Sequence, residues 1–145
     1  MIAVDTNILV YAHRRDGAWF GRAQEVVRRL AEGAEPWAIP WPCLCEFLAV
    51  VTHPRIFAAP SRLPVAVDQV EAWLESPSLS LLAEGRGSWS ELSAQVVAAK
   101  AAGPLVHDAR VAALCLAHGV SELWSADRDF GRFPALKVRN PLVEA

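Results

Sequence analysis

Cysteine is scarce in this sequence, which contains only Cys43, Cys45 and Cys115. An odd, sparse set cannot form the disulfide framework that holds small secreted domains together. Cys43 and Cys45 are two residues apart, which is a poor spacing for a structural zinc site, and no second pair accompanies them. We therefore expect buried free thiols in a reducing compartment.

An excess of one charge and long apolar runs are also missing. The 14 Lys and Arg residues nearly balance the 16 Asp and Glu residues, which argues against a globally basic nucleic-acid binder but allows a local basic rim. No uncharged apolar run approaches the ~18 residues that a membrane span needs. Asp5 interrupts the first apolar run and no basic segment precedes it, so no signal peptide is visible. These absences predict a soluble, cytoplasmic protein that does not contact a membrane.

Apolar residues are plentiful enough for one hydrophobic core. They make up 53% of the 145 residues, and a chain of this length has the usual size of one domain. Such a domain buries roughly 68–70% of its unfolded surface without needing metal or disulfide cross-links. Because no internal repeat, linker or low-complexity tract interrupts the chain, we expect a single domain over residues 1–145.

Short strand-like runs alternate with helical patterns along the chain. The strand-like runs are IAV, WAIPW, LSLLA, SELWSA and LKVRN, and the segments between them mostly have helical spacing. Ser88 and Glu91 have the spacing of a capping box, and Asn7 and Asp108 could each cap a helix. Parallel strands need crossover helices between them. The alternation therefore predicts a three-layer α/β/α domain with a mainly parallel central sheet.

Four carboxylates fall where such a sheet binds its ligands. Asp5 directly follows the first strand, and Glu46 lies in the first or second turn of the helix after the second strand. Asp108 begins a later helix, and Asp127 follows the strand-like ELWS by two residues. The ends of strands and the starts of the following helices share one edge of an open parallel sheet. We therefore expect these four acids to converge.

Converging carboxylates predict a metal site. Each anion disfavours ionisation of the others, so something positive must offset the repulsion. Hard oxygen ligands without histidine or thiolate match Mg²⁺ or Mn²⁺ better than zinc. Such an ion can lower the pKa of a bound water and polarise a phosphoryl group. The sequence therefore indicates metal-dependent phosphodiester hydrolysis.

Each of these acids also has a structural interpretation. Asp108 could be a helix N-cap, and Glu46 could be a solvated helical acid, although its neighbours are apolar. Asp5 has little structural use at the end of a strand. Asp127 and Asp129 compete as turn residues and as the fourth ligand, and we prefer Asp127.

Four segments, MIAVDTNILVYA, CEFLAVVTHPR, HDARVAALCLAHGV and LWSADRDFGRFPALKVRNPL, resemble PIN-domain ribonucleases. More closely, they resemble the VapC-type toxins of bacterial toxin–antitoxin pairs, over nearly the whole chain. The resemblance implies a Mg²⁺- or Mn²⁺-dependent endoribonuclease that hydrolyses RNA by a metal-activated water. It also implies a homodimer that a VapB-type antitoxin holds inactive. The catalytic and metal-binding quartet of the family matches Asp5, Glu46, Asp108 and Asp127.

The same resemblance suggests residues that support the quartet. Thr6, Asn7, Ser125 and Asp129 would hydrogen-bond the acids or the metal-bound waters and so fix the ligand geometry. For Asn7, a plain helix cap is an equal alternative. Ser125 stands where many relatives carry threonine, and both residues have a hydroxyl.

Substrate contacts are sought among the arginines that follow the acidic segments. Arg14, Arg15, Arg128 and Arg132 could grip phosphates and offset the acidic field. Solvated surface arginines are the alternative for any one of them. The proline-rich residues 54–64 mark an insert that could form part of a dimer or antitoxin surface.

Aromatic residues and histidines are assigned mostly to structure. Trp37, Trp41, Trp73 and Trp124 sit in apolar elements and are expected in the core. His13 and His107 flank the acidic segments, but a lone histidine is more often a core or surface residue.

Two rival functions remain at the level of sequence. In an aspartyl-phosphate phosphatase, Asp5 would attack phosphorus as a nucleophile. Those enzymes usually have a second acid two residues later, where this chain has Asn7. A non-catalytic module that binds RNA or protein is the other possibility, with the acids serving only structure.

Overall fold

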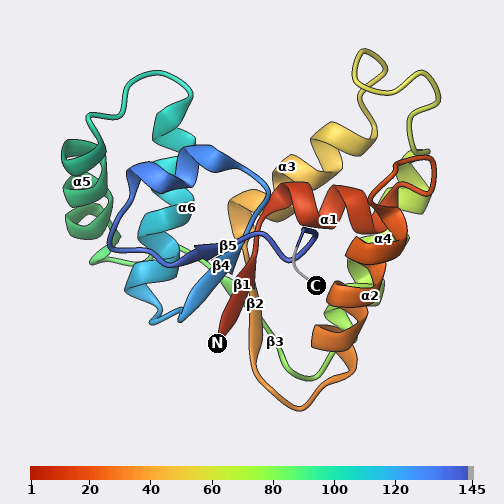
Figure 1. Ribbon diagram of the computed structural model, residues 1–145, viewed down its shortest axis with the longest axis horizontal. Coiled ribbons are helices and arrows are strands. Elements are labelled where there is room, and N and C mark those ends of the chain that lie inside the picture. The colour runs from red at the N-terminus through yellow and green to blue at the C-terminus, as the bar shows by residue number, and fades with distance from the viewer. Residues whose placement is uncertain (144–145) are drawn as a thin grey trace.

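Strands and helices alternate along the chain from β1 to β5 (Figure 1). The computed structural model describes residues 1–143. In chain order its elements are β1 (Ile2–Val4), α1 (Thr6–His13), α2 (Phe20–Glu32), β2 (Trp37–Pro40), α3 (Trp41–Val51), α4 (Leu63–Leu74), β3 (Leu79–Leu82), α5 (Ser88–Ala99), α6 (Leu105–Ala117), β4 (Glu122–Trp124), the 3₁₀ helix η1 (Arg128–Arg132) and β5 (Val138–Arg139).

The strands form one parallel sheet in the order β3-β2-β1-β4-β5. Ala3 in the central strand β1 pairs with Ala38 of β2 and with Leu123 of β4. Figure 1 shows α1, α2 and α4 on one side of the sheet and α5 and α6 on the other. The predicted three-layer fold is confirmed. The chain runs outward from β1 to β3 and then returns to β4, so the carboxyl ends of β1 and β4 form the topological switch point where such sheets bind ligands.

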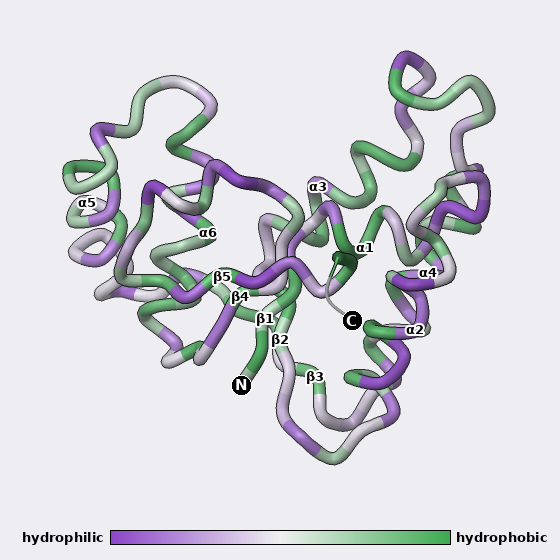
Figure 2. Tube along the Cα trace, viewed as in Figure 1, coloured by the Kyte–Doolittle hydropathy of each residue, from purple (hydrophilic) through white to green (hydrophobic). Residues whose placement is uncertain are grey.

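The central strands are buried, as a parallel sheet covered on both faces requires. All four residues of β2 are buried, and so are Ala3 and Val4 of β1. Helix α2 instead alternates apolar and charged residues, which Figure 2 shows as mixed green and purple, and it turns Ala23, Val26 and Val27 inward. Within residues 1–143, no helix is long and apolar enough to cross a bilayer.

Two predicted helix caps are wrong. Ser88 is the first residue of α5, and its hydroxyl accepts a hydrogen bond from the backbone of Gly85 at 2.7 Å, so it forms no capping box with Glu91. Helix α6 begins at Leu105, directly after a proline that suits the start of a helix. Asp108 therefore lies in the first turn of α6 and does not cap it.

The predicted core is correct for most tryptophans and cysteines. Trp37 and Trp73 are buried, and Trp124 is partly buried. Trp41 is 45% exposed, because it is the first residue of α3 and lines a cavity at the edge of the sheet. All three cysteines are free, as expected, but Cys45 is exposed because it lines the same cavity.

Candidate active site

One cavity of about 570 Å³ lies beyond the carboxyl ends of the central strands. Its lining includes all four predicted acids, Asp5, Glu46, Asp108 and Asp127. They come from the end of β1, the second turn of α3, the first turn of α6 and the segment after β4. The predicted convergence of these acids is therefore confirmed. The fold brings together residues separated by more than one hundred positions.

Asp5 forms the buried floor of this cavity, where only 7% of its surface is exposed. Its Oδ2 accepts hydrogen bonds from the Ser125 hydroxyl at 2.7 Å and from Asn7 Nδ2 at 3.2 Å. Its Oδ1 accepts from the Cys43 thiol at 3.5 Å. Burial raises the pKa of Asp5, and hydrogen bonds from Ser125, the backbone of Thr6 and Cys43 offset part of that rise because they favour the anion. Asp5 is thus fixed in place before any ligand binds.

Ser125 and Asn7 connect the floor to the segment after β4. The Ser125 hydroxyl uses its one proton for Asp5 and accepts from Asn7 Nδ2 at 3.2 Å and from the backbone of Asp127 at 3.0 Å. Asn7 Oδ1 accepts from the backbone of Ala126 at 3.1 Å. Asn7 is the second residue of α1, so the prediction that it caps this helix is wrong as well. Its side chain instead ties the helix to the loop that carries Asp127. The hydroxyl oxygen of Thr6 is buried and has no hydrogen-bond partner within residues 1–143.

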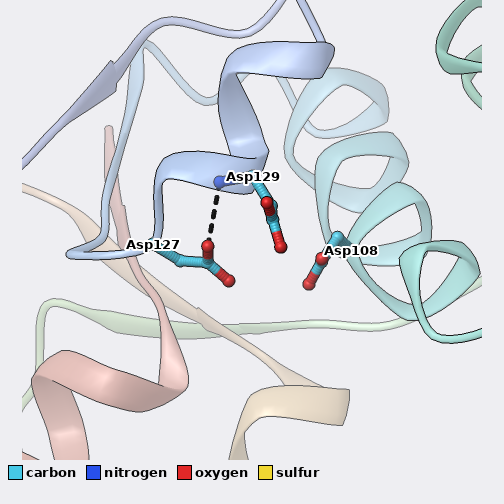
Figure 3. Close-up of side chains that lie close together, drawn as sticks. All are labelled: Asp108, Asp127 and Asp129. Carbon is cyan, nitrogen blue, oxygen red and sulfur yellow. Dashed lines mark hydrogen bonds between the residues drawn. The ribbon is translucent and has the colours of Figure 1, made fainter.

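The rim of the cavity carries a tighter cluster of carboxylates (Figure 3). One oxygen each from Asp108, Asp127 and Asp129 lies within 4.8 Å of the other two. Asp127 Oδ1 also accepts a hydrogen bond from the backbone of Asp129 at 2.9 Å, which fixes the start of η1. Burial, followed by the charges of the neighbouring acids, raises the pKa of Asp108 to about 6. Asp129 is more exposed than Asp127 and does not line the main cavity.

Glu46 faces the same acids from helix α3. Burial raises its pKa, the charge of Asp5 adds to this rise, and His107 opposes it. His107 is exposed and lines the cavity from α6. Glu46 is exposed on α3, but its charge is coupled to those of the other acids, so it is not an isolated acid.

The chemistry of these donors fits a small divalent cation. They are carboxylate oxygens whose charges raise the pKa values of Asp108 and Glu46, and the buried hydroxyl of Thr6, which has no hydrogen-bond partner among the described residues, lies in the same lining. Arg110 also lines the cavity, but its guanidinium is paired with Glu84. Oxygen donors of this kind match Mg²⁺ or Mn²⁺. A bound cation would offset the repulsion that the protein leaves in place.

The four predicted phosphate-binding arginines lie outside the lining of this cavity. The Arg14 side chain is only 11% exposed, and it pairs with Asp16 at 2.7 Å and donates to the carbonyl of Ala59 at 2.9 Å. Its charge is therefore used within the protein. The other three are exposed: Arg15, Arg128 and Arg132.

The sequence did not reveal the apolar part of the cavity. Val10, Tyr11, Val50, Ile56 and Phe57 line it together with the acids. Two of them could have been found from the helical spacing of the sequence. Tyr11 follows Asn7 by four residues on α1, and Val50 follows Glu46 by four on α3, so each lies on the same helical face as a site residue. Ile56 and Phe57 belong to an irregular segment without such a repeat.

Comparison with known proteins agrees with this fold and site. The PIN domain family pattern matches residues 2–136. Ribonuclease VapC48 of Mycobacterium tuberculosis is 34% identical over 137 residues, which cover 94% of each chain. Ribonuclease VapC43 of the same organism is 37% identical over 142 residues, or 98% of this chain and 96% of that one.

Solved structures show the same fold. VapBC2 from Rickettsia felis, bound to a DNA fragment from its promoter, contains a chain with a TM-score of 0.71. That likeness covers 97% of this chain and 98% of the other at 19% identity. The sarcin-ricin loop cleaving toxin VapC20 of M. tuberculosis gives a TM-score of 0.66, covering 90% of this chain and 93% of that toxin, at 17% identity. From its sequence, its fold and its cavity of acids, this chain belongs to the PIN domain family, among the VapC ribonucleases.

Proposed function

We propose that this chain is a Mg²⁺- or Mn²⁺-dependent endoribonuclease and the toxin of a toxin–antitoxin pair. The observation that carries the proposal is the meeting of Asp5, Glu46, Asp108 and Asp127 in one cavity at the switch point of the sheet. The named relatives are ribonucleases, and they match almost the whole chain. Residues 1–145 would form one nuclease domain that works in the cytoplasm.

The acids would divide the work of binding and orientation. Asp108 and Asp127 would hold the cation, with Asp5 beneath them directly or through a water. A divalent cation bound there would polarise the scissile phosphate and lower the pKa of the attacking water. Glu46 would accept a hydrogen bond from that water and orient it. Ser125 and Asn7 would keep Asp5 from turning, because both donate to the same carboxylate oxygen.

The structure gives little support to Asp5 as a nucleophile in a phosphatase. Asp5 is buried, and both of its oxygens accept hydrogen bonds. The position two residues on is Asn7, which donates to Asp5 and cannot act as the second acid.

Calorimetry with millimolar Mg²⁺ or Mn²⁺ separates the nuclease from a non-catalytic module, because only the nuclease requires the cation.

A protein partner would inhibit the toxin. Among the solved structures with this fold are VapBC2 and FitAB, each bound to a DNA fragment. Large apolar side chains are exposed on and beside α4, including Leu63, Val67 and Leu74, and such surfaces mark protein interfaces. We propose a VapB-type antitoxin as the inhibitor and a homodimer as the toxin. Co-purification with the product of the neighbouring gene, followed by gel filtration, tests both.

RNA cleavage by purified variants tests the proposed activity. The protein is expected to cleave a structured RNA in Mg²⁺ or Mn²⁺ and to stop when EDTA is added. Asp5→Asn and Asp108→Asn should each abolish cleavage. Asp68→Asn is the matched control, because Asp68 is an exposed acid on α4 that does not line the cavity. Unchanged cleavage by both site variants would overturn the proposal.

A further inference from the structure

The candidate active-site cavity is lined by two unlike kinds of side chain. Beside the acids, its lining contains the apolar and aromatic side chains Tyr11, Trp41, Ile56 and Phe57 with Val10 and Val50, which we call the apolar wall. Helices α1 and α3 both carry this change, because each places an apolar residue four positions after a polar one. Four residues of helix rise about 6 Å. The apolar wall therefore begins one turn away from the acids on two helices at once.

Much of this apolar wall is exposed. Ile56 is 53% exposed and Trp41 is 45% exposed. Apolar surface in contact with water is costly, and a ligand that covers it gains that free energy on binding. Since the wall and the acids line the same cavity, a ligand larger than a metal ion can contact both.

The outer part of the wall is held in place by Arg14. Ile56 and Phe57 come from the irregular residues 52–62 between α3 and α4. The Arg14 guanidinium lies 4.1 Å from the centre of the Phe57 ring, and its Nη1 donates to the carbonyl of Ala59 at 2.9 Å. Two further nitrogens of Arg14 pair with Asp16 at 3.0 and 2.7 Å. This one side chain therefore fixes both the ring and the backbone of the segment.

Neighbouring contacts fix the end of the same segment. His13 Nε2 lies 2.9 Å from the Ser61 hydroxyl, and its Nδ1 lies 3.2 Å from Gln69 Oε1 on α4. The backbone of Ser61 donates to the carbonyl of Val51 at 2.8 Å. The segment that carries Ile56 and Phe57 is therefore preorganised by exposed and partly buried polar contacts within the protein, and it does not depend on a ligand for its position.

We propose that this wall is a nucleobase subsite, which receives the base of an unpaired nucleotide beside the scissile phosphate, and that Arg14 is its positioning residue. This inference rests on the proposed ribonuclease function. A nucleotide matches both the acids and the apolar wall, because its phosphate suits a cation held by the acids and its base has apolar faces that pack on aromatic rings. Paired bases are stacked inside a helix and cannot reach such a wall. The substrate class is thus RNA with unpaired bases at the cleavage point.

RNA binding without cleavage tests the subsite. In an Asp108→Asn background that leaves RNA intact, fluorescence anisotropy would compare a mixed-sequence 12-nucleotide RNA, its duplex, and a ribose-phosphate strand without bases. The single strand should bind more tightly than the other two. Phe57→Ala should weaken single-strand binding by about fivefold to a hundredfold, the range of base–aromatic stacking. Ile56→Ala should weaken it less, because it removes apolar contact without a ring, and both variants should leave the base-free strand unaffected.

Control variants separate the wall from general effects. Val97→Ala removes a still more exposed apolar side chain from α5, outside the cavity, and should change nothing. Phe57→Leu keeps the apolar packing if Phe57→Ala does not fold, and it should still lose affinity because it lacks the ring.

The role of Arg14 is tested through the same affinity ratio between the single strand and the base-free strand. Arg14→Gln should lower this ratio, and Arg14→Lys should do so less. Arg15→Gln is the matched control, because Arg15 is exposed and near Phe20 instead. Arg15→Gln should change the affinity for both strands by the same factor and leave the ratio unchanged. If Arg14 had only a general structural role, Arg14→Gln would likewise leave the ratio unchanged.

The opposite results would overturn the base subsite. An unchanged ratio in the Phe57, Ile56 and Arg14 variants would do so, as would equal binding of the duplex. Weakened binding of a protein partner by the wall variants, without a change in RNA binding, would assign the wall to that partner. If the unmodified protein cleaves RNA but the ratio does not change, only the subsite fails; if it cleaves no RNA, the proposed function itself fails.

Discussion

The floor and the rim of the cavity hold carboxylates in opposite ways. On the floor, Asp5 is buried and receives hydrogen bonds from Ser125, Asn7 and Cys43. On the rim, the carboxylates of Asp108 and its neighbours lie within 4.8 Å of each other, and their charges contribute to the raised pKa of Asp108. The protein supplies three donors to the floor, whereas the contacts described for the rim include one donor, the backbone of Asp129 to Asp127. The charge of the rim is therefore the less balanced of the two. The comparison suggests that Asp5 is held in a fixed position and that a cation bound at the rim would offset the charges of Asp108 and its neighbours.

The largest expected effect comes from removing a rim charge. Asp108→Asn should lower RNA cleavage by about 1000-fold or more, because a metal site contributes several kcal/mol to the transition state. The variant should still fold, since the substitution keeps the volume of the side chain and relieves repulsion. Single-turnover cleavage and a thermal melt of the same sample check both expectations. A collapsed fold would instead assign Asp108 a structural role.

A smaller effect is expected from loosening the floor. Ser125→Ala removes three hydrogen bonds of a buried hydroxyl and should lower the free energy of unfolding by about 1–3 kcal/mol. It should also weaken Mn²⁺ binding by about 10–100-fold, as loss of a group that orients a ligand does. Urea unfolding and calorimetry measure the two quantities. Ser125→Thr keeps the hydroxyl and is the control, and equal Mn²⁺ affinity in all three proteins would contradict the role of the floor.

A comparison of Asp127 with Asp129 sharpens the picture of the rim. Asp127 lines the cavity with the other acids, whereas Asp129 clusters with Asp108 and Asp127 but does not line it. Asp127→Asn should therefore weaken Mn²⁺ binding more than Asp129→Asn, by roughly tenfold, equivalent to about 1.4 kcal/mol. Asparagine retains an acceptor for the backbone of residue 129, so the start of η1 should survive. Calorimetry of the two variants decides which acid is the better ligand.

The smallest effect is a pH dependence of stability without metal. The pKa of Asp108 is raised from 3.8 to about 6, and the pKa values of Asp5 and Glu46 are also raised. Between about pH 4 and 6 the folded state therefore binds more protons than the unfolded state, so these groups add stability as the pH falls.

Thermal melts in EDTA measure this dependence. The parent protein should lose stability as the pH rises through about 6, and Asp108→Asn should show a weaker loss. The difference should not exceed about 1 kcal/mol, because Asp108 is partly exposed and solvent screens its charge. Added Mn²⁺ should reverse the trend, since metal binding favours the ionised carboxylates. A parent protein whose stability is independent of pH in this range would contradict the unbalanced rim.

The fold and the four acids were predictable because they depend on local order. Apolar runs alternate with helical patterns, and the acids lie near strand ends or helix starts. Strand ends and helix starts share one edge of a parallel sheet, so Asp5 and Asp108 come together even if the exact bounds of the elements are wrong. Helix starts were less predictable. Leu105, and not Asp108, begins α6, because the preceding proline provides a competing start signal.

The surroundings of single side chains were not predictable. Arg14 follows an acidic motif in the sequence, but its contacts depend on where residues 52–62 fold, and these residues have no periodic pattern. Trp41 is a large apolar residue of the kind expected in a core, yet it is partly exposed and lines the cavity. Both depend on tertiary contacts that no local spacing encodes.

A crystal structure in millimolar Mn²⁺, with the ion located by its anomalous scattering, tests the unbalanced rim most directly. We expect an ion in this cavity with carboxylate oxygens of Asp108 and Asp127 about 2 Å away and with Asp5 beneath it. An empty cavity at that concentration, or an ion bound only elsewhere, would contradict the claim that these acids form a cation site.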